Sequence, residues 1–187
     1  MVLATAALIV ALSNAGFAAT TNRARSDEIV KEAEATVAAA GQKKPVDTTL
    51  INRAIGDLHQ AIKIDPHNDS AFVDLGFCYS VLRDPETAED MYRTATLINP
   101  SAGNFKELAD IYLRTGDAEA ALMAANAGLQ KEPHNAKLFN AKGLALSDLG
   151  RPDEAEQAFK KAVEYDPSLA VARQNLEALR AKNHYEE

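Results

Sequence analysis

Four prolines divide most of the chain at nearly equal intervals. Pro66, Pro100, Pro133 and Pro167 follow one another at spacings of 34, 33 and 34 residues. Each closes an apolar-periodic run that ends in an acidic or amide residue, in the segments KIDP, LINP, QKEP and EYDP. Because proline cannot continue a helix, each run predicts a helix that stops just before it. A fixed period of this length predicts one structural unit repeated along a solenoid.

Small and large residues keep fixed positions relative to these prolines. Because two helices approach closely only where side chains are small, columns of small residues predict helix contacts, and columns of large residues predict the side chains that fill the joints. The small columns are Ala54, Ala88, Ala121 and Ala155, then Ala61, Ala95, Gly128 and Ala162, then Gly76, Ala109 and Gly143. The large columns are Phe72, Phe105 and Phe139, then Tyr79, Tyr112 and Leu146, then Leu58, Tyr92 and Phe159, the last with Ala125 as its exception.

These columns resemble the tetratricopeptide repeat, a helix–turn–helix unit of about 34 residues. The resemblance implies an all-α solenoid, a right-handed superhelix of antiparallel helix pairs with a C-terminal capping helix. One domain would span residues 26–182, followed by a tail over 183–187. Within it the resemblance places a degenerate repeat at 26–66, full repeats at 69–101, 102–135 and 136–168, and the capping helix at 169–182.

The N-terminal segment differs from the rest of the chain. Residues 2–12 are apolar or small except for Thr5, and eleven residues are too few for a membrane core, which takes about twenty. We therefore predict a signal peptide over residues 1–18 and a linker over 19–25. No Lys or Arg precedes the apolar run, so the alternative is an uncleaved segment that packs on the domain or contacts a membrane. Export would place a bacterial protein in the periplasm or envelope; without export it would be cytoplasmic.

The composition and motifs argue against several functions. A net charge of −7 without a basic stripe argues against nucleic-acid binding. The motifs of metalloproteases, nucleotide-binding loops and serine hydrolases are missing from the sequence. The only cysteine, Cys78, is predicted as a small buried hydrophobe, and His67 and His134 as exposed residues of matching turns. We expect no enzyme, cofactor or metal, and an unrecognised site stays an alternative.

The resemblance also implies where a partner would bind. In this family the first helix of each repeat lines a concave groove that receives a segment of another protein. An apolar spot beside lysines and arginines would suit a peptide with a hydrophobic side chain and a nearby acid. The matching positions are Val73, Asp74 and Phe77, then Lys106, Glu107, Asp110 and Arg114, then Lys137, Asn140, Leu144 and Ser147.

One subgroup of the family clamps the terminal carboxylate of chaperone tails. Of that clamp only Lys137 is matched, because Val73, Phe77, Glu107 and Ala141 occupy the other positions. We therefore predict a non-catalytic protein-binding scaffold that is not a chaperone-tail receptor, with assembly in the bacterial envelope as its setting if the chain is exported. Two alternatives stay open. The groove residues have no dedicated ligand, or the protein is a structural module that binds copies of itself.

Overall fold

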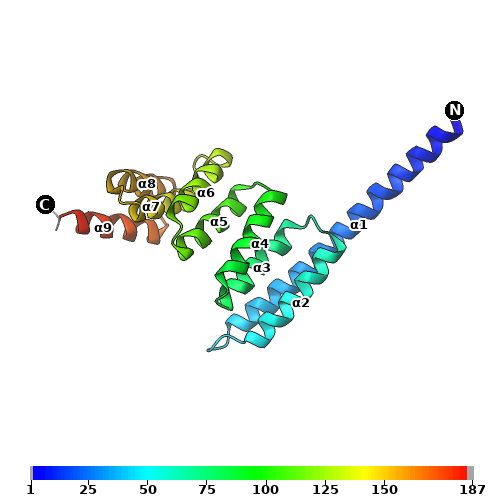
Figure 1. Cartoon of the computed structure of the whole chain (residues 1–187), viewed down its shortest axis with the longest axis horizontal. Coiled ribbons are helices and arrows are strands. Elements are labelled where there is room, and N and C mark those ends of the chain that lie inside the picture. Colours follow the sequence, from blue (N-terminus) through cyan, green and yellow to red (C-terminus); the bar gives the residue numbers. More distant parts are fainter. Residues whose placement is uncertain (1, 185–187) are drawn as a thin grey trace. The chain divides into compact units, whose positions relative to one another are not determined.

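A computed structural model describes the backbone of residues 2–184 and the side chains of residue 16 and residues 18–182. Over these residues the chain is helical, without a strand (Figure 1). The helices are α1 (Val2–Gly41), α2 (Thr48–Ile64), α3 (Asp69–Val81), α4 (Pro85–Ile98), α5 (Ala102–Thr115), α6 (Ala118–Lys131), α7 (Ala136–Asp148), α8 (Pro152–Tyr165) and α9 (Ala170–His184). They form two compact units, an N-terminal unit up to Asp84 and a C-terminal unit from Pro85. The boundary falls inside the predicted repeat 69–101.

Side chains at the helix starts explain where several helices begin. The side-chain oxygens of five residues accept a backbone N–H from the first turn, which satisfies donors that have no partner within the helix. These residues are Asp47 before α2, Asn68 before α3, Ser101 before α5, Asp117 before α6 and Asn135 before α7. Both α4 and α8 begin at a proline, which suits the first helical position because its missing N–H is not needed there.

The turns that follow α3, α5 and α7 share one backbone conformation. Gly116 has φ of 84° and Gly150 has φ of 70°, and Arg83 at the matching position has φ of 61°. All three lie seventeen residues before a repeat proline. A left-handed residue commonly ends a helix, and glycine adopts it without steric cost. The repeated turn therefore has the same geometry even where arginine replaces glycine.

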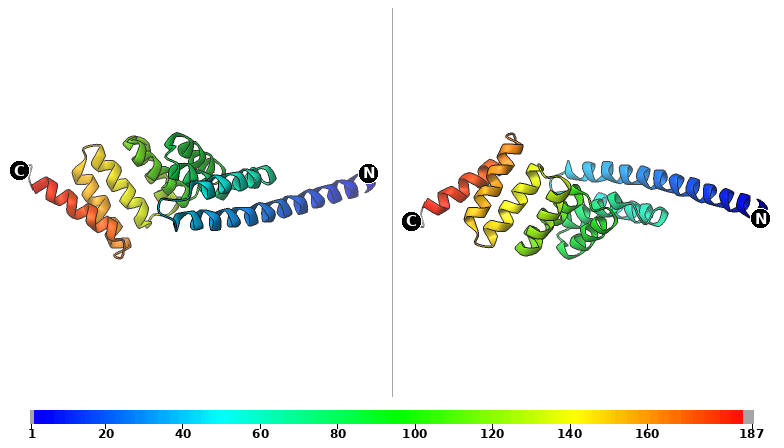
Figure 2. Two further views of the ribbon diagram at one scale, coloured as in Figure 1. Left: turned by 90° about the horizontal axis from the view of Figure 1, so that it is seen from below. Right: turned by 90° about the horizontal axis from the view of Figure 1, so that it is seen from above.

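In the N-terminal unit, α1, α2 and α3 pack against one another, and Figure 2 shows α1 and α2 side by side. Ala33 of α1, Leu58 of α2 and Leu75 of α3 are fully buried. Residues 19–25, predicted as a linker, lie inside α1. That prediction was wrong because neither glycine nor proline interrupts the chain between Gly16 and Gly41, so nothing ends the helix there.

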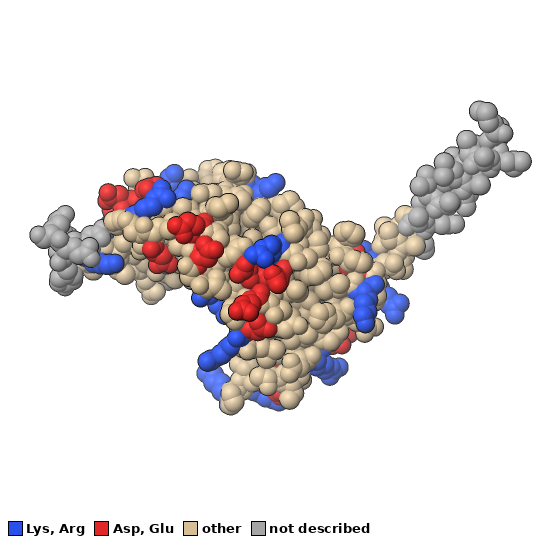
Figure 3. All heavy atoms as spheres, in the orientation of Figure 1, with Lys and Arg blue, Asp and Glu red and all other residues tan. Residues whose placement is uncertain are grey.

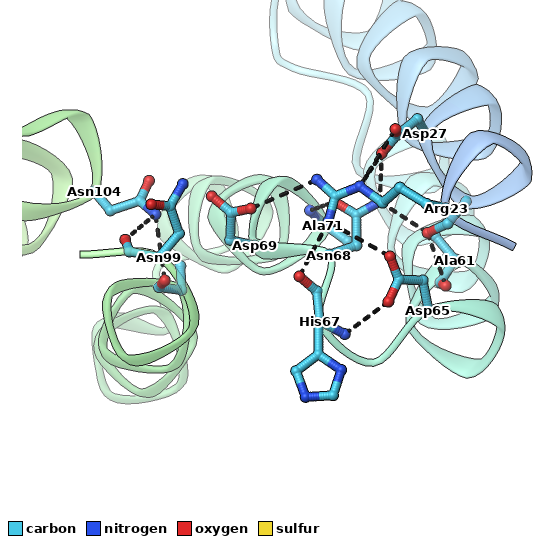
Figure 4. A network of polar contacts seen from close by, with 12 residues as sticks. Arg23, Asp27, Ala61, Asp65, His67, Asn68, Asp69, Ala71, Asn99 and Asn104 are labelled. Atoms are coloured by element: carbon cyan, nitrogen blue, oxygen red, sulfur yellow. Dashed lines mark hydrogen bonds and ion pairs between the residues drawn. The ribbon is translucent and has the colours of Figure 1, made fainter. Parts of the chain in front are cut away.

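A polar network fixes α1 to the turn between α2 and α3 (Figure 4). The Asn68 amide donates to Ser26 Oγ at 2.8 Å and to Asp27 Oδ1 at 2.9 Å, and Ser26 Oγ donates to the carbonyl of Ala61 at 2.9 Å. Asn68 and Ser26 are fully buried. Nearby, Arg23 donates to the carbonyl of His67 at 3.1 Å. Buried polar groups need such partners, so this network fixes the position of α1 on the turn.

The side chains of Ala18, Ala19 and Thr20 in α1 are exposed. Of the predicted signal peptide, Met1 lies outside the described residues, and residues 2–18 are helical in backbone. Among residues 2–184 no helix is both long enough and apolar enough to span a bilayer. Cleavage after Ala18 stays a prediction.

In the C-terminal unit, α5 packs on α6, α7 packs on α8, and α9 packs on α8 and α7. A β-carbon added at Gly143 would lie 2.5 Å from Cε1 of Phe159, and one at Gly128 would lie 2.8 Å from Cδ1 of Leu138. The close approaches predicted at these two small residues are confirmed. The last helix continues to His184, beyond the predicted end at 182, and residues 185–187 lie outside the described part.

Candidate functional site

The predicted groove residues of the N-terminal unit lie on α3, partly against α1. Phe77 is 49% exposed and Val73 is half-buried. Asp74 is half-buried, and burial, followed by the charge of Glu34 on α1, raises its pKa from 3.8 to about 7. Its Oδ2 atom is buried without a hydrogen-bond partner among the described residues. Asp74 therefore faces its own unit, whereas Phe77 is available to a partner.

Asp74 should make the stability of the protein depend on pH. The pKa of Asp74 is about 7 in the folded protein, whereas the ordinary value of 3.8 applies to the unfolded chain. Between these two values the folded protein keeps the proton and the unfolded chain has lost it. The free energy of unfolding therefore falls as pH rises through that interval. After discounting for solvent screening we expect a loss of about 1–2 kcal/mol between about pH 5 and pH 8. In Asp74→Asn this loss should disappear, as measured by urea unfolding across pH.

The control for this prediction is Asp148→Asn, a neutralised carboxylate at an exposed position. It should leave the pH profile of the wild type unchanged. Parallel pH profiles for the wild type and Asp74→Asn would contradict the assignment, whatever the absolute stability of the variant.

One of the two predicted cations of α5, Lys106, is already engaged within its own helix. Lys106 Nζ lies 2.9 Å from Asp110 Oδ2 and 3.1 Å from Glu107 Oε1. Burial by itself lowers the pKa of Lys106, but the two carboxylates outweigh it and raise that pKa. Three predicted groove residues thus pair with one another, and a partner's acid would have to compete with them. Arg114, about two turns beyond Lys106 on α5, is exposed.

Three of the four predicted residues of α7, namely Asn140, Leu144 and Ser147, lie beside the last helix. Asn140 Oδ1 accepts a hydrogen bond from Asn175 Nδ2 of α9 at 2.9 Å. Leu144 packs against the core between α7, α8 and α9, and Lys137 is exposed. Leu144 also lines a pocket of about 200 Å³, which we call the α7–α9 pocket; its other lining residues are Ser147, Phe159, Asn175, Ala178, Leu179 and Lys182.

Sequence reasoning missed the contribution of α9 to this pocket. We interpreted 169–182 as a cap, yet Asn175 lies 34 residues after Ala141, which occupies a position of the chaperone-tail clamp. Continuing the period by one helix would have found Asn175 and its neighbours. The capping helix therefore supplies one wall of the α7–α9 pocket and also covers the core.

The nucleophile and metal-ligand candidates have other surroundings. Cys78 is fully buried, and burial, with a smaller effect of Asp74, raises its pKa to about 11, so the thiol is neutral near pH 7. His67 is exposed, and the ring of His134 lies edge-on to Tyr165 with centroids 4.8 Å apart. Within the described residues there is no group of three or more His, Cys, Asp or Glu side chains that could hold a metal ion.

Comparison with known proteins identifies one repeat by sequence. Residues 136–169 match the model of the tetratricopeptide repeat. The chain is 31% identical over 97 residues to small glutamine-rich tetratricopeptide repeat-containing protein 2 of Mycosarcoma maydis, covering 51% of this chain and 28% of that protein. It is 26% identical over 115 residues to BBSome complex member BBS4 of Bos taurus, covering 62% and 22%. The chain thus spans less than a third of these relatives.

Solved structures share the fold at low sequence identity. The pilF protein of Pseudomonas aeruginosa has a TM-score of 0.72 at 18% identity, covering 86% of this chain and 71% of that one. MamA has a TM-score of 0.65 at 20% identity, covering 73% and 80%. YrrB, described as a tetratricopeptide repeat protein with an unusual peptide-binding site, has a TM-score of 0.61 at 22% identity, covering 81% and 78%. The chain therefore has the all-α tetratricopeptide solenoid fold, and residues 136–169 form a tetratricopeptide repeat.

Proposed function

We propose that this protein is a non-catalytic scaffold that binds a segment of a partner protein on the face formed by α5, α7 and α9. This proposal rests on the α7–α9 pocket. It combines an apolar wall at Leu144 and Leu179 with the amide of Asn175 and the ammonium of Lys182. An apolar side chain would enter the pocket, and an acid beside it would meet Lys182.

Two structural neighbours support peptide recognition by this fold. YrrB has, by its description, a peptide-binding site, and the second tetratricopeptide domain of human RPAP3 was solved in complex with an HSP70 peptide. The proposed mechanism rests on shape. Because packed helix pairs hold their backbone surface rigid before binding, the scaffold loses little conformational freedom, which reduces the cost of association.

We also propose that the chain is exported and works in the bacterial cell envelope. The short apolar segment at residues 2–12 and the small residues Gly16 and Ala18 support this setting. Sequencing the N-terminus of the protein purified from its host tests it. A mature chain that starts at Ala19 is expected, and a chain that retains residues 1–18 would contradict cleavage.

Leu144→Asp should weaken peptide binding at least tenfold, because a carboxylate would then stand in the apolar wall of the pocket. Peptides would be selected from a random display library on the intact chain, and their affinities measured by fluorescence anisotropy.

Lys106→Glu combined with Lys137→Glu should weaken the binding of the same peptides, because the introduced carboxylates would repel the acids of the peptides.

Leu97→Asp is the matched control, since it makes the same change at an exposed position of α4. It should leave the affinity of these peptides unchanged. Selected peptides that lose affinity in Leu97→Asp and keep it in Leu144→Asp would move the binding surface away from the α7–α9 pocket. Circular dichroism of each variant would show that the helices remain.

A further inference from the structure

The C-terminal unit contains two clefts at equivalent places in consecutive repeats. Seven residues line each, and every residue of the second lies 34 positions after its counterpart in the first. The α5–α6 cleft is lined by Phe105, Leu108, Tyr112, Ala120, Met123, Ala124 and Ala127. The α7–α8 cleft is lined by Phe139, Lys142, Leu146, Glu154, Gln157, Ala158 and Lys161. The α7–α8 cleft can therefore be compared with the α5–α6 cleft residue by residue.

Long polar side chains occupy the α7–α8 cleft. Lys142 Nζ donates to Asn126 Oδ1 of α6 at 2.8 Å, and Lys161 Nζ lies 5.4 Å from the ring centroid of Phe139. The stem of each lysine covers apolar surface while its ammonium has a favourable partner. The cleft has a volume of only about 110 Å³. The protein's own side chains thus cover apolar surface that would otherwise be open to a ligand.

The α5–α6 cleft lacks these covering groups. Leu108 stands where Lys142 does, and Ala127 stands where Lys161 does, so Phe105 has no lysine above it. The cleft is correspondingly larger, about 250 Å³. Met123 at its edge is 73% exposed. An apolar hollow with an exposed methionine on its edge is typical of a surface that receives another apolar group.

Acidic groups lie near one end of the α5–α6 cleft. Arg93 of α4 donates to the Tyr112 hydroxyl at 3.4 Å and pairs with Asp90 at 3.0 Å and with Glu89. Glu119 lies four residues before Met123 and therefore one turn away on the same face of α6. Three carboxylates against one guanidinium leave an excess of negative charge. Figure 3 shows acidic side chains gathered over the region of α4.

The size of the α5–α6 cleft distinguishes between classes of ligand. Drug-sized molecules occupy pockets of about 300–1,000 Å³, whereas an apolar cavity of about 150 Å³ already accepts benzene. A volume of about 250 Å³ therefore suits one large apolar side chain. An anchor of this kind on an amphipathic helix, with charges beside it, is a recurring mode of recognition between proteins.

We propose that the α5–α6 cleft docks a basic amphipathic segment of a partner protein, with one apolar anchor side chain in the hollow and lysines or arginines against Glu89, Asp90 and Glu119. This site goes beyond the proposed function, because its lining residues differ from those of the α7–α9 pocket. A partner could use either surface alone or both together.

The experiment introduces three residues of the α7–α8 cleft at the matching positions of the α5–α6 cleft. The triple variant Ala120→Glu, Met123→Gln and Ala127→Lys introduces the residues found at the matching positions of the α7–α8 cleft. Because those residues already fit this geometry one repeat later, the variant should fold. One acid and one base are added together, so the net charge of −7 is retained and unspecific attraction to cations is unchanged.

The probe is a synthetic amphipathic helix with leucine on one face and lysine on the other, titrated into the intact chain with ¹³C-methyl-labelled methionine. The chain has three methionines, so Met123 reports on the cleft and Met91 of α4 serves as an internal reference. The Met123 signal should shift and the Met91 signal should shift less. Binding, measured by anisotropy, should weaken at least tenfold with a peptide in which glutamate replaces lysine, and equally with one in which alanine replaces leucine.

In the triple variant the leucine–lysine peptide should bind at least tenfold more weakly. Unchanged binding there, or equal binding of the lysine and glutamate peptides, would overturn the proposal. Sedimentation of the chain alone completes the test. Self-association that the triple variant abolishes would identify a second copy of the chain as the occupant and contradict a basic partner.

Discussion

Gly143→Ala should destabilise the C-terminal unit by about 2 kcal/mol, although alanine is the better helix former. The added β-carbon would lie 2.5 Å from Cε1 and 2.6 Å from Cδ1 of Phe159. That ring is 1% exposed and packed among α7, α8 and α9, so moving it aside would break its contacts in the core. Urea unfolding followed by circular dichroism measures the loss.

Gly56→Ala is the matched control, because Gly56 is also in mid-helix but a β-carbon there would meet nothing within 4 Å. It should stabilise the protein by about 0.5–1 kcal/mol. Phe159→Leu should recover part of the loss in Gly143→Ala, since the smaller side chain leaves room. The double-mutant cycle then gives a coupling energy between the two positions. A stabilising Gly143→Ala, or strict additivity, would contradict the close contact.

The second large effect is expected at Asn68, where alanine should cost about 2–3 kcal/mol. About 1 kcal/mol comes from the lost cap at the start of α3, where Asn68 Oδ1 accepts from the N–H of Ala71. The remainder comes from the buried hydrogen bond to Ser26 Oγ and the partly buried one to Asp27 Oδ1. Hydrogen exchange should show α1 opening from the turn, because these bonds connect the two.

Asn135→Ala separates the two contributions. Asn135 caps α7 through the N–H of Leu138 at 3.1 Å, and its amide donates to Glu132 in an exposed contact. Losing this cap should cost only about 1 kcal/mol. Equal losses at Asn68 and Asn135 would mean that the bonds to α1 contribute nothing.

The regular part of the fold could be predicted from residue spacing. Proline ends a helix wherever it stands, and small residues at Gly128 and Gly143 permit contacts that larger ones would prevent, so the columns predicted both helix ends and close approaches. The exposed turn position of His67 and the buried position of Cys78 followed from the same columns. These properties depend on local sterics and on the phase of the repeat.

The candidate sites depended on neighbours that spacing does not specify. Lys106 was expected to meet a partner's acid, but Asp110 and Glu107 reach it first. Asp74 was expected in an open groove, but α1 lies close enough for Glu34 to affect its pKa. The helix α9 was expected only to cover the core, but it also lines the α7–α9 pocket. In each case the outcome depends on which groups the packed structure brings together, and residue spacing does not specify that.

The sequence by itself determined the helical repeat, the ends of its units and the residues that recur in each, because proline, glycine and alanine act on the backbone within a few residues of their own position. Only the tertiary structure decided which groups the long side chains at those recurring positions reach. That Lys142 and Lys161 stand where Leu108 and Ala127 stand one repeat earlier follows from the sequence. The hydrogen bond of Lys142 to Asn126, and the position of Lys161 Nζ 5.4 Å from the ring centroid of Phe139, depend on packing. The physical reason is that coverage depends on the reach of long side chains across helices, and that becomes defined when the helices pack.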